Sequence, residues 1–247
     1  MFEREEREGV VVLRLAHGRG NALDLEFLRG ITREMCELAH APAMVLTGRE
    51  GIFSAGVDLV RLRDGGADYV REFLPALDEA FDALFEFEGP VVAAINGHAI
   101  AGGCVLACAC DVRVMGEGSG RIGVPELRVG VPFPPAALEL IRRVAPGHVE
   151  EIVLRGETYT AQEGLERGLV DEVVPSEEVL DRAVAVAAEL ARVPRSAFAI
   201  SKRALRAPTS ERIARYRAQT GAEQLRAWSS PEVLGAVDAY VRAVLRK

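Results

Sequence analysis

In the first 175 residues, short continuous runs of hydrophobic residues alternate with stretches in which hydrophobic residues recur at helical spacing. This alternation of strand and helix patterns predicts an α/β domain. Short apolar runs bounded by turn residues are typical of buried strands, and they occupy residues 9–15, 43–47, 91–95, 111–115 and 170–174. Stretches with helical character lie between them, over residues 24–39, 68–88 and 102–110. Strands that alternate with helices in this way favour a parallel sheet.

The remaining segments divide into expected loops and a helical tail. Residues 48–56 and the turn at Asn96-Gly97 are predicted to be loops, and the polar residues 61–66 to be mobile. Asp24 and Thr160 are candidate helix N-caps. Further helices are expected over residues 132–144, 147–155, 161–167, 177–192, 195–206, 210–228 and 231–245. The organisation is therefore a core of residues 1–190 and a helical C-terminal region of residues 191–247.

Composition and charge exclude several classes of protein. The 247 residues are 49% hydrophobic, which suffices for one large domain, and the formal net charge is −7. Such an acidic chain lacks the overall basic character typical of nucleic-acid-binding proteins. Its apolar runs are too short to span a bilayer, and its charged start, MFEREEREG, differs from a secretory signal. We therefore expect a cytoplasmic protein with no nucleic-acid or membrane partner.

Three of the four cysteines lie close together in one apolar segment, as Cys104, Cys108 and Cys110. The first two are spaced to share a helix face, but Cys110 is displaced from that face and no CxxC or HxxxH pair is near. Free cysteines are commonly buried in protein cores. Reduced core thiols, with no metal site, are the favoured interpretation.

A strand followed by a turn of small residues occurs twice, over residues 43–58 and 91–103. The second turn contains Gly102-Gly103 and begins a predicted helix, whose first backbone N–H groups lack partners within the helix. These groups and the positive end of the helix dipole suit an anion or a developing negative oxygen. Two such turns from neighbouring repeats could face one another.

A series of motifs resembles the enoyl-CoA hydratase/isomerase (crotonase) superfamily. In chain order the motifs are Asn21-Ala22-Leu23, Leu46-Thr47-Gly48, residues 53–59 (FSAGVDL), Pro90-Val91, Asn96-Gly97, Ala101-Gly102-Gly103, residues 110–113 (CDVR), Pro125-Glu126, Gly130 and Gly168-Leu169-Val170. One motif alone would be weak support, but the series stands in family order across nearly the whole chain. The resemblance implies a spiral of ββα repeats and a helical trimerisation region, assembled as a homotrimer or a dimer of trimers.

The resemblance also implies an acyl-CoA thioester as substrate, with no cofactor. It places an oxyanion hole of two backbone N–H groups at Val57 and Gly102. The residues expected to contact the bound thioester are Ser54, Ala55, Gly56, Asp58, Leu59 and Gly103. Asp58 is also expected to fix its own turn. Phe133 is a candidate wall of the acyl pocket, although an aromatic residue in the core is the commoner case.

Three further polar residues have competing interpretations. His98 precedes the glycines and could polarise a ligand, but packing or a hydrogen bond to the backbone is favoured. Lys202 and Arg203 lie in the helical tail and could meet CoA phosphates. A solvated helix face is the more usual role for such a pair.

The candidate acid and base residues favour one reaction of the superfamily. Its hydratases use two glutamates, and the two corresponding positions here are Val105 and Glu126. Hydration must activate water and also protonate Cα, whereas moving a double bond from C3 to C2 needs one carboxylate, which carries a proton from C2 to C4. The apolar neighbours of Glu126 are expected to raise its pKa. The pattern is similar to that of Δ3,Δ2-enoyl-CoA isomerases.

Other reactions and a binding role stay open as alternatives. A single glutamate could support hydration with a substituted base, thioester hydrolysis or decarboxylation of an acyl-CoA. A catalytically silent acyl-CoA-binding protein is a third hypothesis, which the presence of Glu126 disfavours. A nucleophilic dehalogenase is weaker still, because Val105 offers no carboxylate.

Overall fold

The computed structural model describes residues 1–49 and 51–245 and contains two β-sheets. The larger sheet has the order β1-β2-β3-β5-β7-β10, with β1 antiparallel to β2 and every other neighbouring pair parallel. Its strands are β1 (Phe2–Arg7), β2 (Val10–Leu15), β3 (Met44–Thr47), β5 (Val91–Ile95), β7 (Val112–Gly116) and β10 (Glu172–Val174). The predicted parallel sheet is confirmed, while the charged strand β1 was not predicted.

The smaller sheet has the order β4-β6-β8-β9, and two of its strands, β4 and β6, lie in segments that were expected to be a loop and a turn. Its strands are β4 (Gly51–Ser54), β6 (Gly97–Ile100), β8 (Ile122–Gly123) and β9 (Thr158–Tyr159). The loop predictions for residues 48–56 and for the turn at Asn96-Gly97 are therefore wrong. These strands have two to four residues and carry no clear period, so backbone pairing between distant segments decides their structure.

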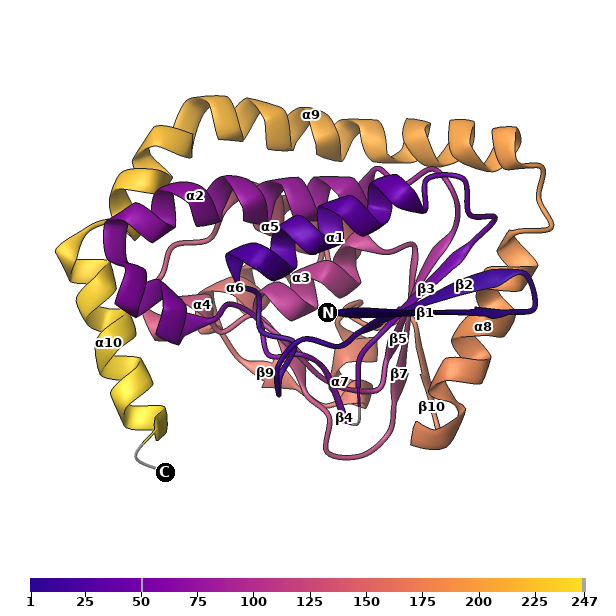
Figure 1. The fold of residues 1–247 in the computed structure, drawn as a ribbon, viewed down its shortest axis with the longest axis horizontal. Coiled ribbons are helices and arrows are strands. Elements are labelled where there is room, and N and C mark those ends of the chain that lie inside the picture. Colours follow the sequence, from indigo (N-terminus) through magenta and orange to yellow (C-terminus); the bar gives the residue numbers. More distant parts are fainter. Residues whose placement is uncertain (50, 246–247) are drawn as a thin grey trace.

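Ten α-helices lie in the described part of the chain, most of them where the sequence indicated (Figure 1). They are α1 (Leu25–Glu37), α2 (Leu59–Phe85), α3 (Gly102–Ala109), α4 (Glu126–Val129), α5 (Pro135–Val144), α6 (Val149–Arg155), α7 (Ala161–Glu166), α8 (Val179–Leu190), α9 (Arg195–Trp228) and α10 (Pro231–Leu245), with a 3-10 turn at Ser176–Glu178. None of these helices combines the length and the apolar character that crossing a membrane requires.

The central strands of the larger sheet are buried on both faces, which explains why they are apolar without interruption. One hydrophobic layer packs on α8 and contains Val10, Val12, Val45, Val92, Ala94 and Val114. Val91, Ala93 and Ile95 of β5 point instead into the main core, which α1, α2 and α3 cover. Strands covered on both faces have no polar side to alternate with the apolar one. The five residues of β5 are consequently all buried.

The helix boundaries follow local capping signals. The Asp24 side chain accepts a 2.8 Å hydrogen bond from the Phe27 N–H and begins α1, and Thr160 begins α7 with a capping box. Asp58 likewise caps α2 by accepting from Val60 and Arg61. Residues 61–66, which were expected to be a mobile polar segment, lie within the helix that this cap begins. Only Gly66, at φ 57° and ψ −148°, interrupts the helical backbone.

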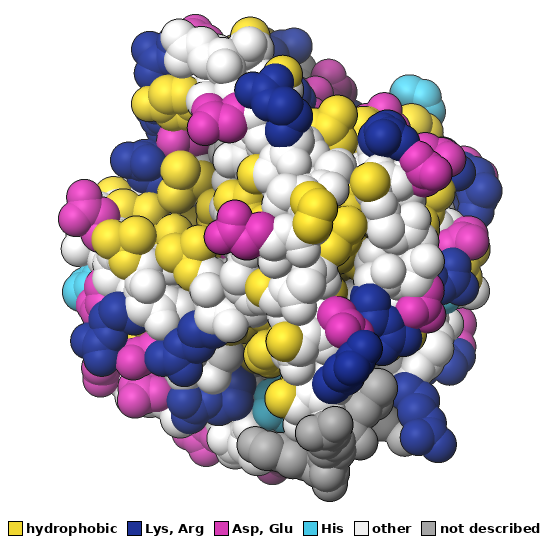
Figure 2. Space-filling model, turned by 90° about the vertical axis from the view of Figure 1, so that its left-hand side faces the viewer, with side chains coloured by type: hydrophobic (Ala, Val, Ile, Leu, Met, Phe, Trp, Pro, Cys, Tyr) yellow, Lys and Arg dark blue, Asp and Glu magenta, His cyan; other side chains and the backbone are white. Residues whose placement is uncertain are grey.

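The C-terminal region folds back over the core. The two helices predicted over residues 195–206 and 210–228 form one helix, α9, which continues through Pro208. Buried Arg206 and Ile213 on either side of the proline anchor α9 to the core, and this packing offsets the backbone hydrogen bond that proline removes. Figure 2 views the end of the molecule where α10 lies and shows hydrophobic side chains between charged side chains of both signs.

The far end of the C-terminal region contacts the segment that follows α4. Trp228, 1% exposed, donates a 3.0 Å hydrogen bond from its indole N–H to the Pro132 carbonyl. A Cβ atom on Gly130 would lie 2.8 Å from the Cβ of Ala236 in α10, so the two backbones approach closely. α9 and α10 therefore pack against residues 130–133, and Trp228, Val237 and Val241 of these helices belong to the main core.

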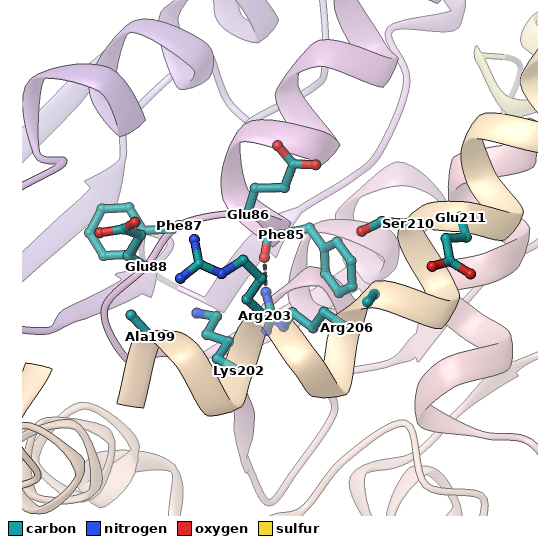
Figure 3. Close-up of a pocket in the computed structure, with 11 residues that line it drawn as sticks. Phe85, Glu86, Phe87, Glu88, Ala199, Lys202, Arg203, Arg206, Ser210 and Glu211 are labelled. Carbon is teal, nitrogen blue, oxygen red and sulfur yellow. Dashed lines mark hydrogen bonds between the residues drawn. The ribbon is translucent and has the colours of Figure 1, made fainter. Parts of the chain in front are cut away.

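A buried ion-pair cluster fastens α9 to the loop before β5. Lys202 Nζ lies 2.7 Å from Asp111 Oδ2 and 2.8 Å from the Gly89 carbonyl oxygen, and Arg206 Nη2 lies 2.6 Å from Asp111 Oδ1. Arg206 also donates to the Phe85 carbonyl, and both cations line a cavity of about 450 Å³ (Figure 3). Burial lowers the pKa of Lys202 to about 8, against the raising effect of Asp111. Lys202 thus serves the fold, and it does not lie on a solvated helix face.

Replacing Asp111 with asparagine should destabilise the fold strongly. Asp111→Asn leaves Lys202 and Arg206 buried without a counter-charge, and removing one partner of a buried ion pair costs roughly 3–5 kcal/mol. The neighbouring exposed residue offers a control, since Arg203→Gln should cost less than about 0.5 kcal/mol. Urea unfolding measures both values, and equal midpoints for the two variants would contradict the assignment.

Candidate active site

The segments that carry Val57, Gly102 and Glu126 begin at the carboxyl ends of three neighbouring strands in the smaller sheet. β4 ends at Ser54, just before Val57, and β6 ends at Ile100, just before Gly102. β8 ends at Gly123, three residues before Glu126. β6 pairs in parallel with both β4 and β8, so all three carboxyl ends lie at the same edge. The structure therefore brings together the two predicted N–H donors and the predicted base.

The first turn is held by the segment that precedes α1. Leu23 and Val57 form a parallel bridge, in which the Leu23 N–H donates to the Gly56 carbonyl at 2.7 Å and the Asp58 N–H donates to the Leu23 carbonyl at 3.0 Å. These bonds engage the Gly56 carbonyl and the Asp58 N–H, which lie on either side of the Val57 N–H. Within residues 1–49 and 51–245, that N–H donates no hydrogen bond. It is available to a ligand.

The second turn places an N–H group at the start of α3. Ala101 precedes the helix with φ 52° and ψ −127°, a conformation that costs a non-glycine residue energy, and its N–H donates to the Gly123 carbonyl at 2.8 Å. Gly102 is the first helical residue, so its N–H has no partner within the helix. No other acceptor for it lies in the described part of the chain.

The two turns are in direct contact through Gly56. A Cβ atom on Gly56 would stand 2.6 Å from the Ile100 carbonyl oxygen, 2.6 Å from the Ala101 Cβ and 3.2 Å from the Gly102 nitrogen. Gly56 also has φ 81°, which favours glycine. Only a residue without a side chain lets the turns adjoin. The result is two free N–H groups in adjoining turns, an arrangement suited to one oxyanion.

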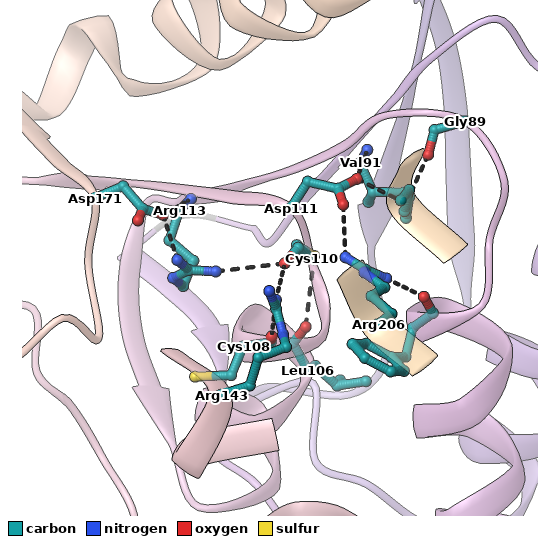
Figure 4. Close-up of polar contacts among 12 residues, drawn as sticks. Gly89, Val91, Leu106, Cys108, Cys110, Asp111, Arg113, Arg143, Asp171 and Arg206 are labelled. Atoms are coloured by element: carbon teal, nitrogen blue, oxygen red, sulfur yellow. Dashed lines mark hydrogen bonds and ion pairs between the residues drawn. The ribbon is translucent and has the colours of Figure 1, made fainter. Parts of the chain in front are cut away.

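The other end of α3 is fixed by two arginines (Figure 4). Arg143 Nη2 donates to the Cys108 and Cys110 carbonyls at 3.2 and 3.0 Å, and Arg113 donates to the Cys110 carbonyl at 3.3 Å. Arg113 is itself paired with Asp171 at 2.6 Å. Cations at a helix C-terminus satisfy its free carbonyls and complement the dipole. The helix that carries the Gly102 N–H is thus held at both ends.

Glu126 is a buried carboxyl group with an unpaired oxygen. Its residue is 7% exposed, and Oε2 has no hydrogen-bond partner in the described residues. Burial raises the pKa of Glu126 to about 8, opposed only by a hydrogen bond from its own backbone. The pKa of the Cys104 thiol in α3 is raised by its hydrogen bond with Cys108, by burial, and by the charges of Cys108 and Glu126. Glu126 therefore lies near α3, the helix that carries the Gly102 N–H, and its raised pKa gives it the basicity of a proton carrier.

A comparison with known proteins identifies the family. Residues 5–241 match the family model of enoyl-CoA hydratase/isomerase. The chain belongs to the enoyl-CoA hydratase/isomerase family. This membership confirms the resemblance drawn from the motif series and the crotonase-like α/β fold with a helical C-terminal region.

Some relatives within the enoyl-CoA hydratase/isomerase family are named hydratases, and others are named isomerases. The chain is 34% identical over 210 residues to the 2,3-dehydroadipyl-CoA hydratase of Escherichia coli, covering 83% of this chain and 81% of that protein. It is 30% identical over 223 residues to the mitochondrial enoyl-CoA delta isomerase 1 of Rattus norvegicus, covering 88% and 77%. The human mitochondrial Δ3-Δ2-enoyl-CoA isomerase structure matches with a TM-score of 0.94 at 25% identity, covering 99% and 98%. These similarities show an enzyme of the enoyl-CoA hydratase/isomerase family, and they do not distinguish hydration from isomerisation.

The other residues singled out in the sequence lie in varied surroundings. Ser54 and Gly103 are buried, Ala55 is exposed, and Leu59 is half-buried in the first turn of α2. Phe133 is 8% exposed in the core, where its carbonyl accepts from Gln224 at 3.0 Å.

For His98 and Asp58, the structure confirms the structural role that the sequence predicted. His98 Nδ1 accepts a 3.2 Å hydrogen bond from the Arg121 N–H, as the backbone-bonding interpretation predicted. Asp58 fixes its own turn by capping α2. Sequence reasoning did not assign a role to Leu23, which holds the Val57 turn through its backbone. Its presence in the motif Asn21-Ala22-Leu23 was the available signal.

The cysteines of the α3 segment and Val105 are buried in the core. Cys104, Cys108 and Cys110 are free, fully buried thiols, and no group of three potential ligands suited to a metal occurs among residues 1–49 and 51–245. Val105 is also fully buried. The helix position that the family resemblance aligned with a hydratase glutamate is therefore apolar and packed.

The raised pKa of Glu126 should make stability depend on pH. Between its ordinary pKa of 4.5 and about 8, the folded chain binds more protons at this group than the unfolded chain does. Rising pH therefore lowers the free energy of unfolding across this window, by up to about 1.4 kcal/mol per pH unit. Glu126→Gln removes the effect, whereas the exposed Glu166→Gln retains it. Urea unfolding at several pH values measures the difference, and a pH-independent gap between the Glu126→Gln and wild-type proteins would refute the raised pKa.

Proposed function

We propose that the protein is an isomerase that converts 3-enoyl-CoA thioesters into 2-enoyl-CoA thioesters. The Glu126 carboxylate removes a proton from C2, and the electron pair moves onto the thioester oxygen to give a dienolate. The N–H groups of Val57 and Gly102 stabilise this oxygen. Glu126 then returns the proton to C4, so the double bond lies between C2 and C3 and the carboxylate is regenerated.

The observation that carries this proposal is that a buried carboxyl group, Glu126, and two free N–H donors follow strands that end at the same edge of the smaller sheet. Proton removal from C2 is difficult because the carbanion is unstable, and each donor aimed at the oxyanion lowers the barrier by about 3–4 kcal/mol. A base with a pKa of about 8 is better matched to a weak carbon acid than an ordinary glutamate is. One group suffices, because the proton that leaves C2 is the proton that returns at C4.

Val105 supports isomerisation over hydration. Hydration of a 2-enoyl thioester requires a second group to activate water, and the family position for that group is a buried valine here. The segment Val131–Pro135, bulky where hydratases have small glycines, is expected to shape the acyl pocket through Phe133.

A one-glutamate hydratase is the second candidate. The 34% identity to the 2,3-dehydroadipyl-CoA hydratase of Escherichia coli favours it. In this reaction, Glu126 would take a proton from a bound water whose oxygen adds to C3, the same oxyanion site would hold the enolate, and Glu126 would then return the proton to C2. Family assembly as trimers and the use of residues 191–247 as a trimerisation region are part of either proposal.

Substituting the base should separate catalysis from binding. Glu126→Gln keeps the shape of the side chain and removes its proton affinity, so we expect turnover of a 3-enoyl-CoA to fall by at least about a thousandfold. The affinity for a saturated acyl-CoA should stay within about twofold, because no ground-state contact depends on the charge. Glu166→Gln is the matched control and should retain wild-type kinetics. Wild-type turnover by the Glu126→Gln variant would sink the assignment of Glu126.

Labelled water should separate isomerisation from hydration. When the wild-type protein is incubated with crotonyl-CoA in oxygen-labelled water, an isomerase leaves C3 unlabelled, and a hydratase gives a 3-hydroxyacyl product with label at C3. Mass spectrometry of the products decides between them. Rapid labelling at C3 would overturn the isomerase proposal, and tight acyl-CoA binding without any turnover would indicate a silent binder.

A further inference from the structure

Ser54 lies where the first donor turn meets the segment before α1. Its side chain is fully buried, so its hydroxyl is not exposed to a ligand. The hydroxyl donates a 2.8 Å hydrogen bond to the Asn21 carbonyl and accepts a 3.1 Å hydrogen bond from the Gly56 N–H. Both hydrogen-bonding functions of this one oxygen are used to join two turns.

These contacts form a closed ring with the Leu23 bridge. The Gly56 carbonyl, which belongs to the same peptide unit as the Val57 N–H, accepts from the Leu23 N–H at 2.7 Å. Asn21 and Leu23 belong to one short segment, which also donates from the Asn21 side-chain amide to the Phe53 carbonyl at 3.0 Å. Ser54 therefore fixes both the strand end and the segment that orients the Val57 peptide.

Ser54 also touches the second donor turn. A Cβ atom on Gly103 would lie 2.5 Å from the Ser54 carbonyl oxygen and 2.7 Å from the Ser54 Cβ, so the first turn of α3 packs directly on this residue. Ser54 pairs with Ala99 of β6 in the smaller sheet. One residue thus contacts the elements that carry both free N–H groups and sets their separation.

We propose that Ser54 is a positioning residue that aligns the Val57 and Gly102 N–H groups on one oxyanion. Its role is to hold the donor geometry, and it does not itself contact the substrate. Donors that are fixed in advance stabilise the charge that develops in the transition state without reorganising during the reaction. Loss of the hydroxyl would let the Val57 peptide tilt, which weakens transition-state binding more than ground-state binding. This inference rests on the proposed function.

The test compares two variants that each delete one buried hydroxyl. Ser54→Ala frees the Asn21 carbonyl and the Gly56 N–H. Thr47→Val is the matched control, because Thr47 is 1% exposed and its hydroxyl donates a 3.0 Å hydrogen bond to the Ala94 carbonyl in the larger sheet. We expect Ser54→Ala to lower kcat by about ten- to a hundredfold, less than the loss of a whole donor. KM and the affinity for a saturated acyl-CoA should change by less than about twofold.

A spectroscopic measurement tests donor geometry independently of turnover. The infrared carbonyl stretch of a bound 2-enoyl-CoA carrying carbon-13 at C1 shifts to lower frequency when the N–H groups polarise it. We expect a smaller shift in Ser54→Ala than in the wild-type or Thr47→Val proteins. Ser54→Cys, which retains a weak donor and acceptor at similar size, should give an intermediate shift and intermediate kcat, and it serves if the alanine variant does not fold.

The outcomes distinguish this inference from the proposed function. Wild-type kcat and carbonyl frequency in both Ser54 variants would overturn the positioning role, as would an equal loss of kcat in Thr47→Val. If Glu126→Gln is inactive while the Ser54 variants retain wild-type kcat, only the positioning role fails. If Glu126→Gln isomerises normally, the proposed function fails, and the carbonyl shift still reports whether Ser54 aligns the two donors.

Discussion

The parallel pairing of β4, β6 and β8 is the constraint on which the site depends. Parallel strands place their carboxyl ends at one edge, so the residues after each strand meet there whatever their separation in sequence. Val57, Gly102 and Glu126 follow these three strands in order. Gly56 then lets the first two turns touch, since any side chain would collide with Ala101 and Ile100. Short strands can do this because the larger sheet and its helices supply the stability.

Burial of Glu126 couples stability to chemistry. A charged carboxylate without a partner is costly in an apolar environment, and the carboxyl group responds by holding its proton to a higher pH. The same property makes it a stronger base once the proton is lost. A second carboxylate at position 105 would be a neighbouring charge, and this helix position is a packed valine here. The fold thus tolerates a destabilising group where the proposed proton transfer needs it.

The rest of the chain fixes the frame around these groups. Two arginines hold the C-terminal end of α3, and Asp111, one residue beyond Cys110, is locked to α9 by Lys202 and Arg206. The ends of α9 and α10 support residues 130–133, which follow Glu126. In the sequence, Lys202 and Arg206 look like part of a charged surface, but in the structure they form buried ion pairs with Asp111. Arg113 and Arg143 engage the carbonyls at the C-terminal end of α3, and the Ala101 N–H just before the helix donates to the Gly123 carbonyl, so that the Gly102 N–H stays free in a fixed turn.

The sequence by itself determined the family, the apolar strands of the larger sheet and most helices, because each rests on local signals: apolar runs for β3 and β5, N-caps at Asp24 and Thr160, and motifs in order along the chain. It also indicated Val57, Gly102 and Glu126, through those motifs. Only the tertiary structure decided the smaller sheet, the continuation of α9 through Pro208, and the internal bonds of Ser54 and Lys202. Strands of two to four residues and paired charges have no local pattern, since their partners lie tens of residues away and are set by packing.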